Sequence, residues 1–422
     1  MQARAAADRF IALSAEQRLA SQVLGADWSI DGVRVWPLEA FQSVQWAVVA
    51  SLAWQYKIRP MTTAALREAG WPGVPAAVRS ALEQAERDCV TKAMQQVALL
   101  RKIAAAAEGG GLRVIVMKGV ALSAHLYGDV FIREAFDLDL LVHPEETERL
   151  DDVLATLGFQ PASQPTPLSA RQEALLERFH HDRKFVHPAS GVIAERHRAL
   201  SGNAHLIATD FDRLWDRRGQ ARIADYSVAI LGDADLARYL AVHAARHGWE
   251  RWKWIADLAV LYHRAGETGL ARLHDDAGTD GLLAIFNCAV LMVAATTGTS
   301  LPSAAVSGAL GDRRARRLAI QALRMASVVH TPDTIGAHRA RLRGAAYRLL
   351  LKPTLGYLAF ELAAFVHHDE DWRALRLPDG LIPLYYLAWP FFYLGRRLRA
   401  LARSRGPRPE GQAATVAAAH GR

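Results

Sequence analysis

One stretch in the first half of the chain constrains the fold more than any other. A short apolar run, Val114–Met117, leads into a Lys118-Gly119 turn, and residues 120–127 then carry apolar side chains at helical spacing. A second apolar run, Asp137–Val142, follows and carries two carboxylates. Two apolar runs separated by a glycine turn and a helix predict a strand, a turn, a helix and a second strand. We therefore expect the chemistry of this chain to be built on a β-sheet.

The two carboxylates of the second run are the first candidates for that chemistry. Side chains at i and i+2 of a strand point to the same face, so Asp137 and Asp139 project together. Two adjacent carboxylates repel each other unless a cation lies between them. A buried strand with paired acids suits an oxygen-loving ion such as Mg2+, and a solvated strand end is the alternative. Three other Asp-x-Asp pairs lack an apolar strand around them: Asp210/Asp212, Asp233/Asp235 and Asp369/Asp371.

Hydrophobic periodicity divides the chain into a mixed α/β part between helical regions. Glu108–Gly111 ends a long helical stretch, and Lys184–His187 with Val192–Arg198 forms an expected hairpin. The expected fold class is α+β, with a small mixed sheet flanked by N- and C-terminal helices. The expected regions are a helical N-terminal region at 1–107, an α/β core at 108–228, a helical domain at 229–345, an apolar helical segment at 346–402 and a disordered basic tail at 403–422.

Three blocks of the chain resemble an uncharacterised nucleotidyltransferase family of the DNA polymerase β-like superfamily. Lys118–Val142 is similar to that family's Lys-Gly, Arg and Asp-hydrophobic-Asp-Leu-Leu-Val pattern. Gly191–His197 resembles its Glu-x-His strand, and Leu240–Asp257 resembles its helical His-x3-His-Gly-Trp block. The resemblance covers residues 90–265 and implies a nucleotidyltransferase-like core that uses Mg2+ or Mn2+ and an NTP. One departure is the turn Lys118-Gly119-Val120, which lacks the phosphate-gripping serine of many enzymes in the superfamily.

The resemblance also implies roles for the carboxylates. Asp137, Asp139 and Glu195 would be the catalytic residues and the metal ligands, because divalent ions held by three carboxylates can activate an acceptor hydroxyl and neutralise a leaving pyrophosphate. Glu195 fits the third role because its strand can pair beside the acidic strand. For Glu195 the alternative is an ordinary surface glutamate beside Arg196 and Arg198.

Three residues are candidates for nucleotide binding. Gly119 allows close backbone approach at a helix N-terminus, where an anion is favoured, and Lys118 would give the triphosphate a point charge. The alternative is a plain turn with an exposed lysine. Arg133 precedes the acidic strand and is suited to clamp a phosphate, while a salt bridge to Glu134 or Asp129 is the other interpretation.

A pair of histidines marks the later helical block. His243 and His247 are four residues apart on one helix face, a spacing that zinc sites use. No third ligand is evident, so we favour a packed histidine–tryptophan face in which Asp257 orients a ring. A helix that faces the substrate is the alternative. His197 shares a strand face with Glu195 and is expected near the metal ions.

Charge and cysteine content limit the setting in which the chain works. Of the net charge of +8, six units come from the segment after Leu394, which has seven arginines and one glutamate. The basic balance is therefore a property of the tail, and no specific nucleic-acid partner is evident. The only cysteines, Cys89 and Cys288, have no metal-type spacing, which fits a reducing, cytoplasmic compartment. Aromatic residues between Leu381 and Leu394, followed by arginines, predict peripheral contact with an anionic membrane.

The expected function is metal-dependent transfer of a nucleoside monophosphate from an NTP to an unknown acceptor: a small molecule, a polymer or a peptide. The alternative is a catalytically inactive nucleotidyltransferase-like protein that binds, or assists, a pathway for a cell-surface polymer or a peptide product. The missing turn serine favours this alternative.

Overall fold

A computed structural model of the chain describes residues 13–22, 24, 44–162, 169–326, 334–366, 379–381, 384–392 and 394–395. Its centre is a seven-stranded mixed sheet with the strand order β3-β4-β5-β2-β1-β7-β6. The strands are β1 (Val114–Val116), β2 (Asp137–Val142), β3 (Gln160–Pro161), β4 (Asp182–His187), β5 (Val192–His197), β6 (Gly219–Ile223) and β7 (Tyr226–Ile230). The pairs β2–β5 and β1–β7 are parallel, and the other neighbours are antiparallel.

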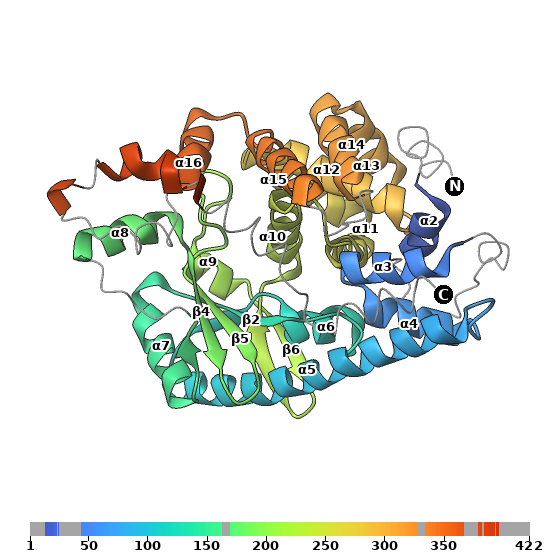
Figure 1. The fold of residues 1–422 in the computed structure, drawn as a ribbon, viewed down its shortest axis with the longest axis horizontal. Helices are drawn as coiled ribbons and strands as arrows, with labels where there is room; N and C mark the ends of the chain where they lie inside the picture. Colours follow the sequence, from blue (N-terminus) through green and yellow to red (C-terminus); the bar gives the residue numbers. More distant parts are fainter. Residues whose placement is uncertain are drawn as a thin grey trace.

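Helices surround the sheet (Figure 1). Those before and between the strands are α2 (Ala15–Gln22), α3 (Trp46–Tyr56), α4 (Arg59–Glu68), α5 (Ala76–Gly109), α6 (Gly119–Tyr127), η3 (Pro144–Glu146), α7 (Thr147–Thr156), α8 (Ala170–Phe179) and α9 (Phe211–Asp216). Those after the strands are α10 (Asp233–Arg246), α11 (Lys253–Thr279), α12 (Leu283–Thr296), α13 (Ser303–Gly311), α14 (Arg313–Ala326), α15 (Thr334–Leu349), α16 (Leu355–Val366) and η4 (Asp379–Leu381). The α+β class with flanking helices is thereby confirmed.

The two faces of the sheet pack against different helices. Figure 1 shows α5 running along one side of the sheet, with α10 to α14 gathered on the other. Leu138 and Leu140 of β2 share a core with α5 and α7. Leu141 belongs to the second core, which the later helices build with α3 and α4. Because alternate residues of β2 face opposite sides, Asp137 and Asp139 lie on the same side as Leu141, towards the later helices.

Several expected elements are confirmed. The strand, turn, helix and strand from Val114 to Val142 form as predicted, and so does the hairpin of β4 and β5. The long helix α5 ends at Gly109. Two of the other Asp-x-Asp pairs mark helix starts. Asp210 caps α9 by accepting a hydrogen bond from the Arg213 amide, and Asp233 is the first residue of α10.

The hairpin of β6 and β7 was not expected from the sequence. Buried side chains alternate along it, at Ala221, Ile223, Val228 and Ile230, as in a half-buried strand pair. The reversal between the strands uses Ala224 at a φ of 52° where hairpins favour asparagine or glycine, so the usual turn signal is missing. Strand β7 runs through residue 228, where we had expected the α/β core to end.

Cys89 and Cys288 are buried free thiols. In the part of the chain that the structure describes, no helix has both the length and the apolar character to cross a membrane. The expected disordered tail at 403–422 lies outside the described residues.

Candidate functional site

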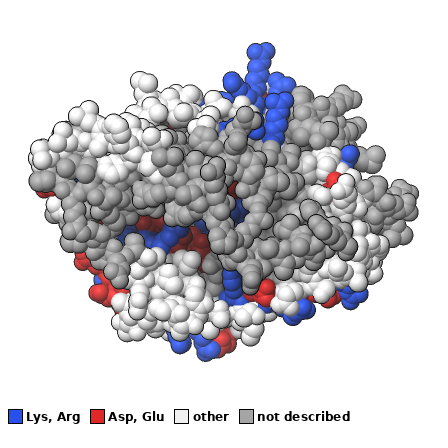
Figure 2. Space-filling view, in the orientation of Figure 1, with Lys and Arg blue, Asp and Glu red and all other residues white. Residues whose placement is uncertain are grey.

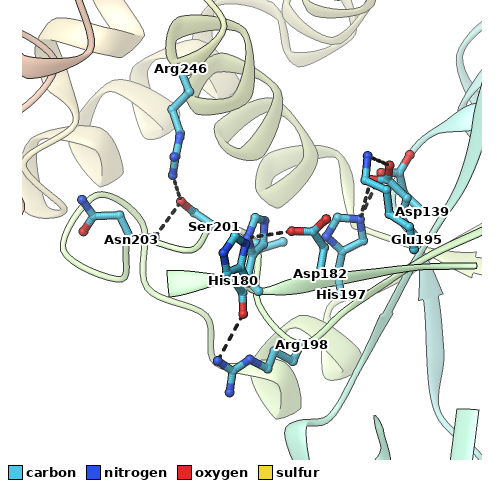
Figure 3. A network of polar contacts seen from close by, with 12 residues as sticks. Asp139, His180, Asp182, Glu195, His197, Arg198, Ser201, Asn203 and Arg246 are labelled. Carbon is cyan, nitrogen blue, oxygen red and sulfur yellow. Dashed lines mark hydrogen bonds and ion pairs between the residues drawn. The ribbon is translucent and has the colours of Figure 1, made fainter. Parts of the chain in front are cut away.

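Strand register brings the candidate residues together. Strands β2 and β5 lie side by side and parallel, with Asp139 opposite Glu195 and Leu141 opposite His197. Side chains two residues apart share a strand face, so Asp139, Glu195 and His197 meet on the face that looks towards the later helices. Figure 3 shows these three side chains lying close together beside the two strands.

The distances within this group fit a cation site. Asp139 Oδ1 lies 3.1 Å from His197 Nε2, and that nitrogen lies 3.7 Å from Glu195 Oε2. One ligand atom from each residue lies within 4.8 Å of the others, and in the described chain this is the one such group of three or more. Asp139 is fully buried, and its Oδ2 has no hydrogen-bond partner among the described residues. A buried carboxylate oxygen without a partner is what a bound cation would satisfy.

Asp137 stands beside this group rather than inside it. The structure places His197 where we had expected Asp137 to be the third ligand. Burial, then the nearby Asp139 carboxylate, raises the pKa of Asp137 to about 6, although Lys118 opposes this rise. The role of Asp137 as a metal ligand stays a prediction.

Two lysines neutralise the carboxylates. Lys118 Nζ lies 2.9 Å from Asp139 Oδ1, and Lys184 Nζ lies 2.7 Å from Glu195 Oε1. Burial alone would raise the pKa of Asp139, but Lys118 and then His197 hold it well below its ordinary value. Asp139 raises the pKa of Lys118 against the effect of burial, so both groups stay charged at neutral pH.

The turn that carries Lys118 requires a glycine at the next position. Gly119 begins α6 with a φ of +73°, a backbone conformation that other residues rarely adopt. A Cβ there would lie 2.9 Å from the Asp137 carbonyl oxygen. Gly119 therefore lets the start of α6 pack directly against the acidic strand, which fixes Lys118 next to Asp139.

A cavity of about 710 Å³ opens above the carboxylates. Figure 2 shows a hollow on one face of the molecule in which basic and acidic side chains lie close together. Its polar lining comes from the sheet, from the loop after β5 and from helices α10, α15 and α16: Lys118, His181, Asp182, Lys184, Glu195, His197, Ser201, Tyr239, His243, Arg246, His247, Arg348 and Glu361. The volume is within the range of about 300–1,000 Å³ that is usual for ligand sites.

Comparison with known proteins agrees with this geometry. Residues 42–298 match the family described as "Uncharacterised nucleotidyltransferase". The chain belongs to this family. No curated protein and no solved structure matches it. The family match extends beyond residues 90–265 on both sides, and it includes α3 to α5 as well as α10 to α12.

In this nucleotidyltransferase-family chain the two helical histidines line the cavity and also pack together. The His243 and His247 rings lie 4.7 Å apart, and the ring of His243 meets Trp254 edge-on at 4.8 Å. Burial, then the charge of Lys118, lowers the pKa of both histidines, that of His247 to about 3. Both are therefore neutral at pH 7. The expected histidine–tryptophan packing is present, and it forms part of the cavity wall.

Arg133 is not brought to the cavity. Its side chain is buried, and Nε donates to both carboxylate oxygens of Asp257 at 2.9 Å. Tyr127 also donates to Asp257, at 2.9 Å. The partner of Arg133 is therefore neither Glu134 nor Asp129. We had expected Asp257 to orient a ring of the histidine–tryptophan face, but it binds Arg133 and Tyr127 instead.

The sequence held usable signals for cavity residues that we had not singled out. Lys184 lies opposite Glu195 in the β4–β5 hairpin, so the hairpin register alone would have placed it at the site. Tyr239 and Arg246 lie four residues before and three residues after His243, on one face of α10. His181 precedes β4 directly, and its ring lies 5.4 Å from that of His197.

Proposed function

We propose that this protein is a metal-dependent nucleotidyltransferase that moves a nucleoside monophosphate from an NTP to a hydroxyl or phosphate acceptor. The observation that carries the proposal is the group of Asp139, Glu195 and His197 at the wall of a cavity lined by cationic side chains. The family match supports the same class of reaction.

The residues present fit a divalent cation. The group offers carboxylate oxygens and one imidazole nitrogen, and the buried Asp139 Oδ2 lacks a partner in the described chain. Asp139 and Glu195 would hold the ion, with Asp137 in reach as a further carboxylate. When bound, a divalent ion would lower the pKa of the acceptor hydroxyl and neutralise charge on the leaving pyrophosphate.

The lining side chains suit the rest of the substrate. Four cations, Lys118, Lys184, Arg246 and Arg348, line the cavity together with three carboxylates, and each cation is ion-paired in this structure. With a divalent ion on the carboxylates, these positive charges would attract a polyphosphate. Lys118 and Gly119 form the turn at the start of α6, where backbone amides and the helix dipole also favour an anion. In the transfer, an acceptor oxygen bonds to the α-phosphorus, and a hydroxyl acceptor gives up its proton to water. The bond between the α-phosphorus and the oxygen that bridges it to the β-phosphorus breaks, and pyrophosphate leaves with that oxygen.

A binding protein without turnover is the second candidate. The turn Lys118-Gly119-Val120 has no serine, and the hydroxyl of the nearby Ser123 donates to the Asp129 carbonyl oxygen at 2.6 Å. A phosphate would then be gripped by the lysine and backbone amides alone. In this candidate, metal and NTP bind, and no bond is broken.

Labelled NTPs separate the two candidates. The protein is incubated with Mn2+ or Mg2+, an NTP labelled at the α-phosphate and cell extract. We expect metal-dependent label on an acceptor and release of pyrophosphate. Asp139→Asn should abolish both, whereas Asp225→Asn, at an exposed side chain outside the cavity, should abolish neither. Binding of NTP without incorporation would favour the second candidate, and no metal-dependent binding would contradict both.

A further inference from the structure

We infer that His197 is a direct metal ligand, which makes this site selective for a first-row transition metal ion such as Mn2+ over Mg2+. The inference rests on the proposed function in that it concerns the same cation site. It adds the chemical class of the ion and a role for a side chain that is not a carboxylate.

The imidazole of His197 lies between the two carboxylates. His197 ends β5, two residues after Glu195, and its side chain is buried on the same strand face. Its Nε2 lies between the two carboxylates, 3.1 Å from Asp139 Oδ1 and 3.7 Å from Glu195 Oε2. Ligand atoms at roughly 2.0–2.2 Å from one ion lie about 3 Å apart when they are adjacent around it. The spacing observed for His197 is close to that of a ligand.

The two lysines each bond to only one oxygen of their partner carboxylate. Lys184 bonds to Glu195 Oε1, which leaves Oε2 as the oxygen that faces His197. Lys118 and His197 share Asp139 Oδ1, while Oδ2 has no partner in the described chain. One oxygen of each carboxylate is thus free of a lysine, and an ion bound there would replace the hydrogen bond between His197 Nε2 and Asp139 Oδ1.

The ligand atoms of this site differ from those that Mg2+ prefers. Mg2+ binds oxygen ligands in near-ideal octahedral geometry and keeps several waters. An imidazole nitrogen adds little to the affinity of a site for Mg2+. It adds more to the affinity for first-row transition metal ions, which rises from Mn2+ towards Cu2+. A site with two carboxylates and a buried imidazole therefore discriminates against Mg2+. Asp137 would add another oxygen without removing this preference.

The test measures metal binding by the full-length protein without a nucleotide. Mn2+ is titrated and detected by electron paramagnetic resonance, with Mg2+ as competitor, and pulsed measurements detect coupling of Mn2+ to a nitrogen-14 nucleus. We expect nitrogen coupling in the wild-type protein. In His197→Gln, which offers an oxygen in place of the ring nitrogen, we expect loss of that coupling. Mn2+ affinity should fall about tenfold or more, and Mg2+ affinity should change less than about threefold.

The matched control is His181→Gln. His181 also lines the cavity, and its ring lies 5.4 Å from that of His197, but it is not part of the three-residue group. This variant should keep both the nitrogen coupling and the Mn2+ preference. Absence of nitrogen coupling in the wild-type protein, or equal loss of Mn2+ and Mg2+ affinity in His197→Gln, would overturn the inference. If His197→Gln does not fold, the wild-type coupling alone decides.

The two proposals fail in different ways. Mn2+ selectivity with nitrogen coupling but no nucleotide incorporation would leave the ligand assignment standing and contradict the transferase. Incorporation that proceeds equally well with Mg2+, without nitrogen coupling to Mn2+, would leave the transferase standing and contradict the ligand assignment.

Discussion

Two clusters of charged residues lie near the acidic strand, and they differ in whether a cavity lies beside them. The cavity cluster consists of Lys118, Asp139, Lys184, Glu195 and His197. The buried cluster consists of Arg59, Tyr127, Arg133, Glu134, Lys253 and Asp257. The cavity cluster faces a cavity of about 710 Å³, and the buried cluster lies among packed helices.

The charges of the buried cluster are paired with one another, although Arg133 Nη2 has no hydrogen-bond partner among the described residues. Arg59 bonds to Glu134, and Arg133 bonds to Asp257. Lys253 donates to the Glu134 carbonyl oxygen at 2.8 Å. Burial, then the charge of Arg133, lowers the pKa of Lys253 to about 7, so this lysine loses its proton far more readily than an exposed one. These contacts tie α4, α6 and α11 to the residues just before β2.

The cavity cluster leaves capacity for a ligand, since the buried Asp139 Oδ2 has no partner in the described chain and cationic side chains line the space beside it. We therefore propose that the charged residues beside the cavity bind a ligand and that those paired among packed helices stabilise the fold. Arg133 belongs to the second group because it does not line the cavity, although it lies in the sequence block that resembles the nucleotidyltransferase family.

Breaking the buried cluster should give the largest loss of stability. Asp257→Ala leaves the Arg133 guanidinium buried without its carboxylate, and removal of one partner of such a pair typically costs about 3–5 kcal/mol of unfolding free energy. Urea unfolding measures the change. Replacing the exposed Asp225 by Ala is the control and should cost less than about 1 kcal/mol. A loss below about 1 kcal/mol for Asp257→Ala would show that the Arg133–Asp257 pair is not a structural tie.

Changing Asp137 should increase stability, with a defined pH dependence. Its pKa of about 6 in the folded protein is above the ordinary value of 3.8, so the folded state binds this proton more tightly. Stability is therefore lost as the pH rises from about 4 to 7, by at most about 3 kcal/mol at 1.36 kcal/mol per unit. Asp137→Asn should raise the melting temperature of the metal-free protein at pH 8 and change it little at pH 4. An equal effect at both pH values would contradict the raised pKa.

Removing Lys118 from the cavity cluster should weaken triphosphate binding more than monophosphate binding. With metal at saturation, Lys118→Ala is expected to lower NTP affinity about tenfold, or about 1.4 kcal/mol, because it removes a charged donor. A nucleoside monophosphate offers fewer phosphate oxygens to that charge, and its affinity should fall less. Calorimetry measures both, with the exposed Lys102→Ala as control. Equal losses for the two ligands would make Lys118 a structural residue.

The weakest expected interaction is the binding of the C-terminal segment to a membrane. Leu384, Leu387, Phe391 and Leu394 are exposed and recur at helical spacing, and arginines follow them in the sequence. We propose that this stripe contacts an anionic membrane without crossing it, each nearby arginine contributing about 1 kcal/mol. In flotation with anionic liposomes, the full chain should float at low salt and less at high salt, while a chain that ends at Leu394 should not float. If both stay in solution at low salt, the proposal is wrong.

Local patterns in the sequence predicted the elements of the site but only part of its membership. The apolar run Asp137–Val142 and the glycine turn before it predicted the acidic strand, and the hairpin around Gly191 predicted the strand that carries Glu195. Those patterns are local, so they need no knowledge of distant packing. Which of Asp137 and His197 joins Asp139 depends on the register between β2 and β5, which are far apart in the chain. The destination of Arg133 depends in the same way on where α11 places Asp257.

The sheet shows the same limit. Strand β1 pairs in parallel with β7, which lies more than a hundred residues later in the chain. The turn between β6 and β7 has an alanine, Ala224, at positive φ. Neither feature leaves a periodic signal near the acidic strand. The sequence showed His243 and His247 as a pair on one helix face, but only the fold shows that this face of α10 lines the cavity beside the carboxylates.

The most direct test of the central claim is metal-dependent NTP binding by the Asp139→Asn variant. Calorimetry with Mn2+ and a non-hydrolysable NTP should give binding to the wild-type protein that EDTA abolishes. In Asp139→Asn, the metal-dependent affinity should fall at least about 100-fold, or about 2.7 kcal/mol. The variant loses the buried partner of Lys118, so its melting temperature should fall, and circular dichroism must show that it is folded at the temperature of the measurement. Unchanged metal-dependent affinity in a folded Asp139→Asn protein would contradict the claim that this buried carboxylate holds the cation.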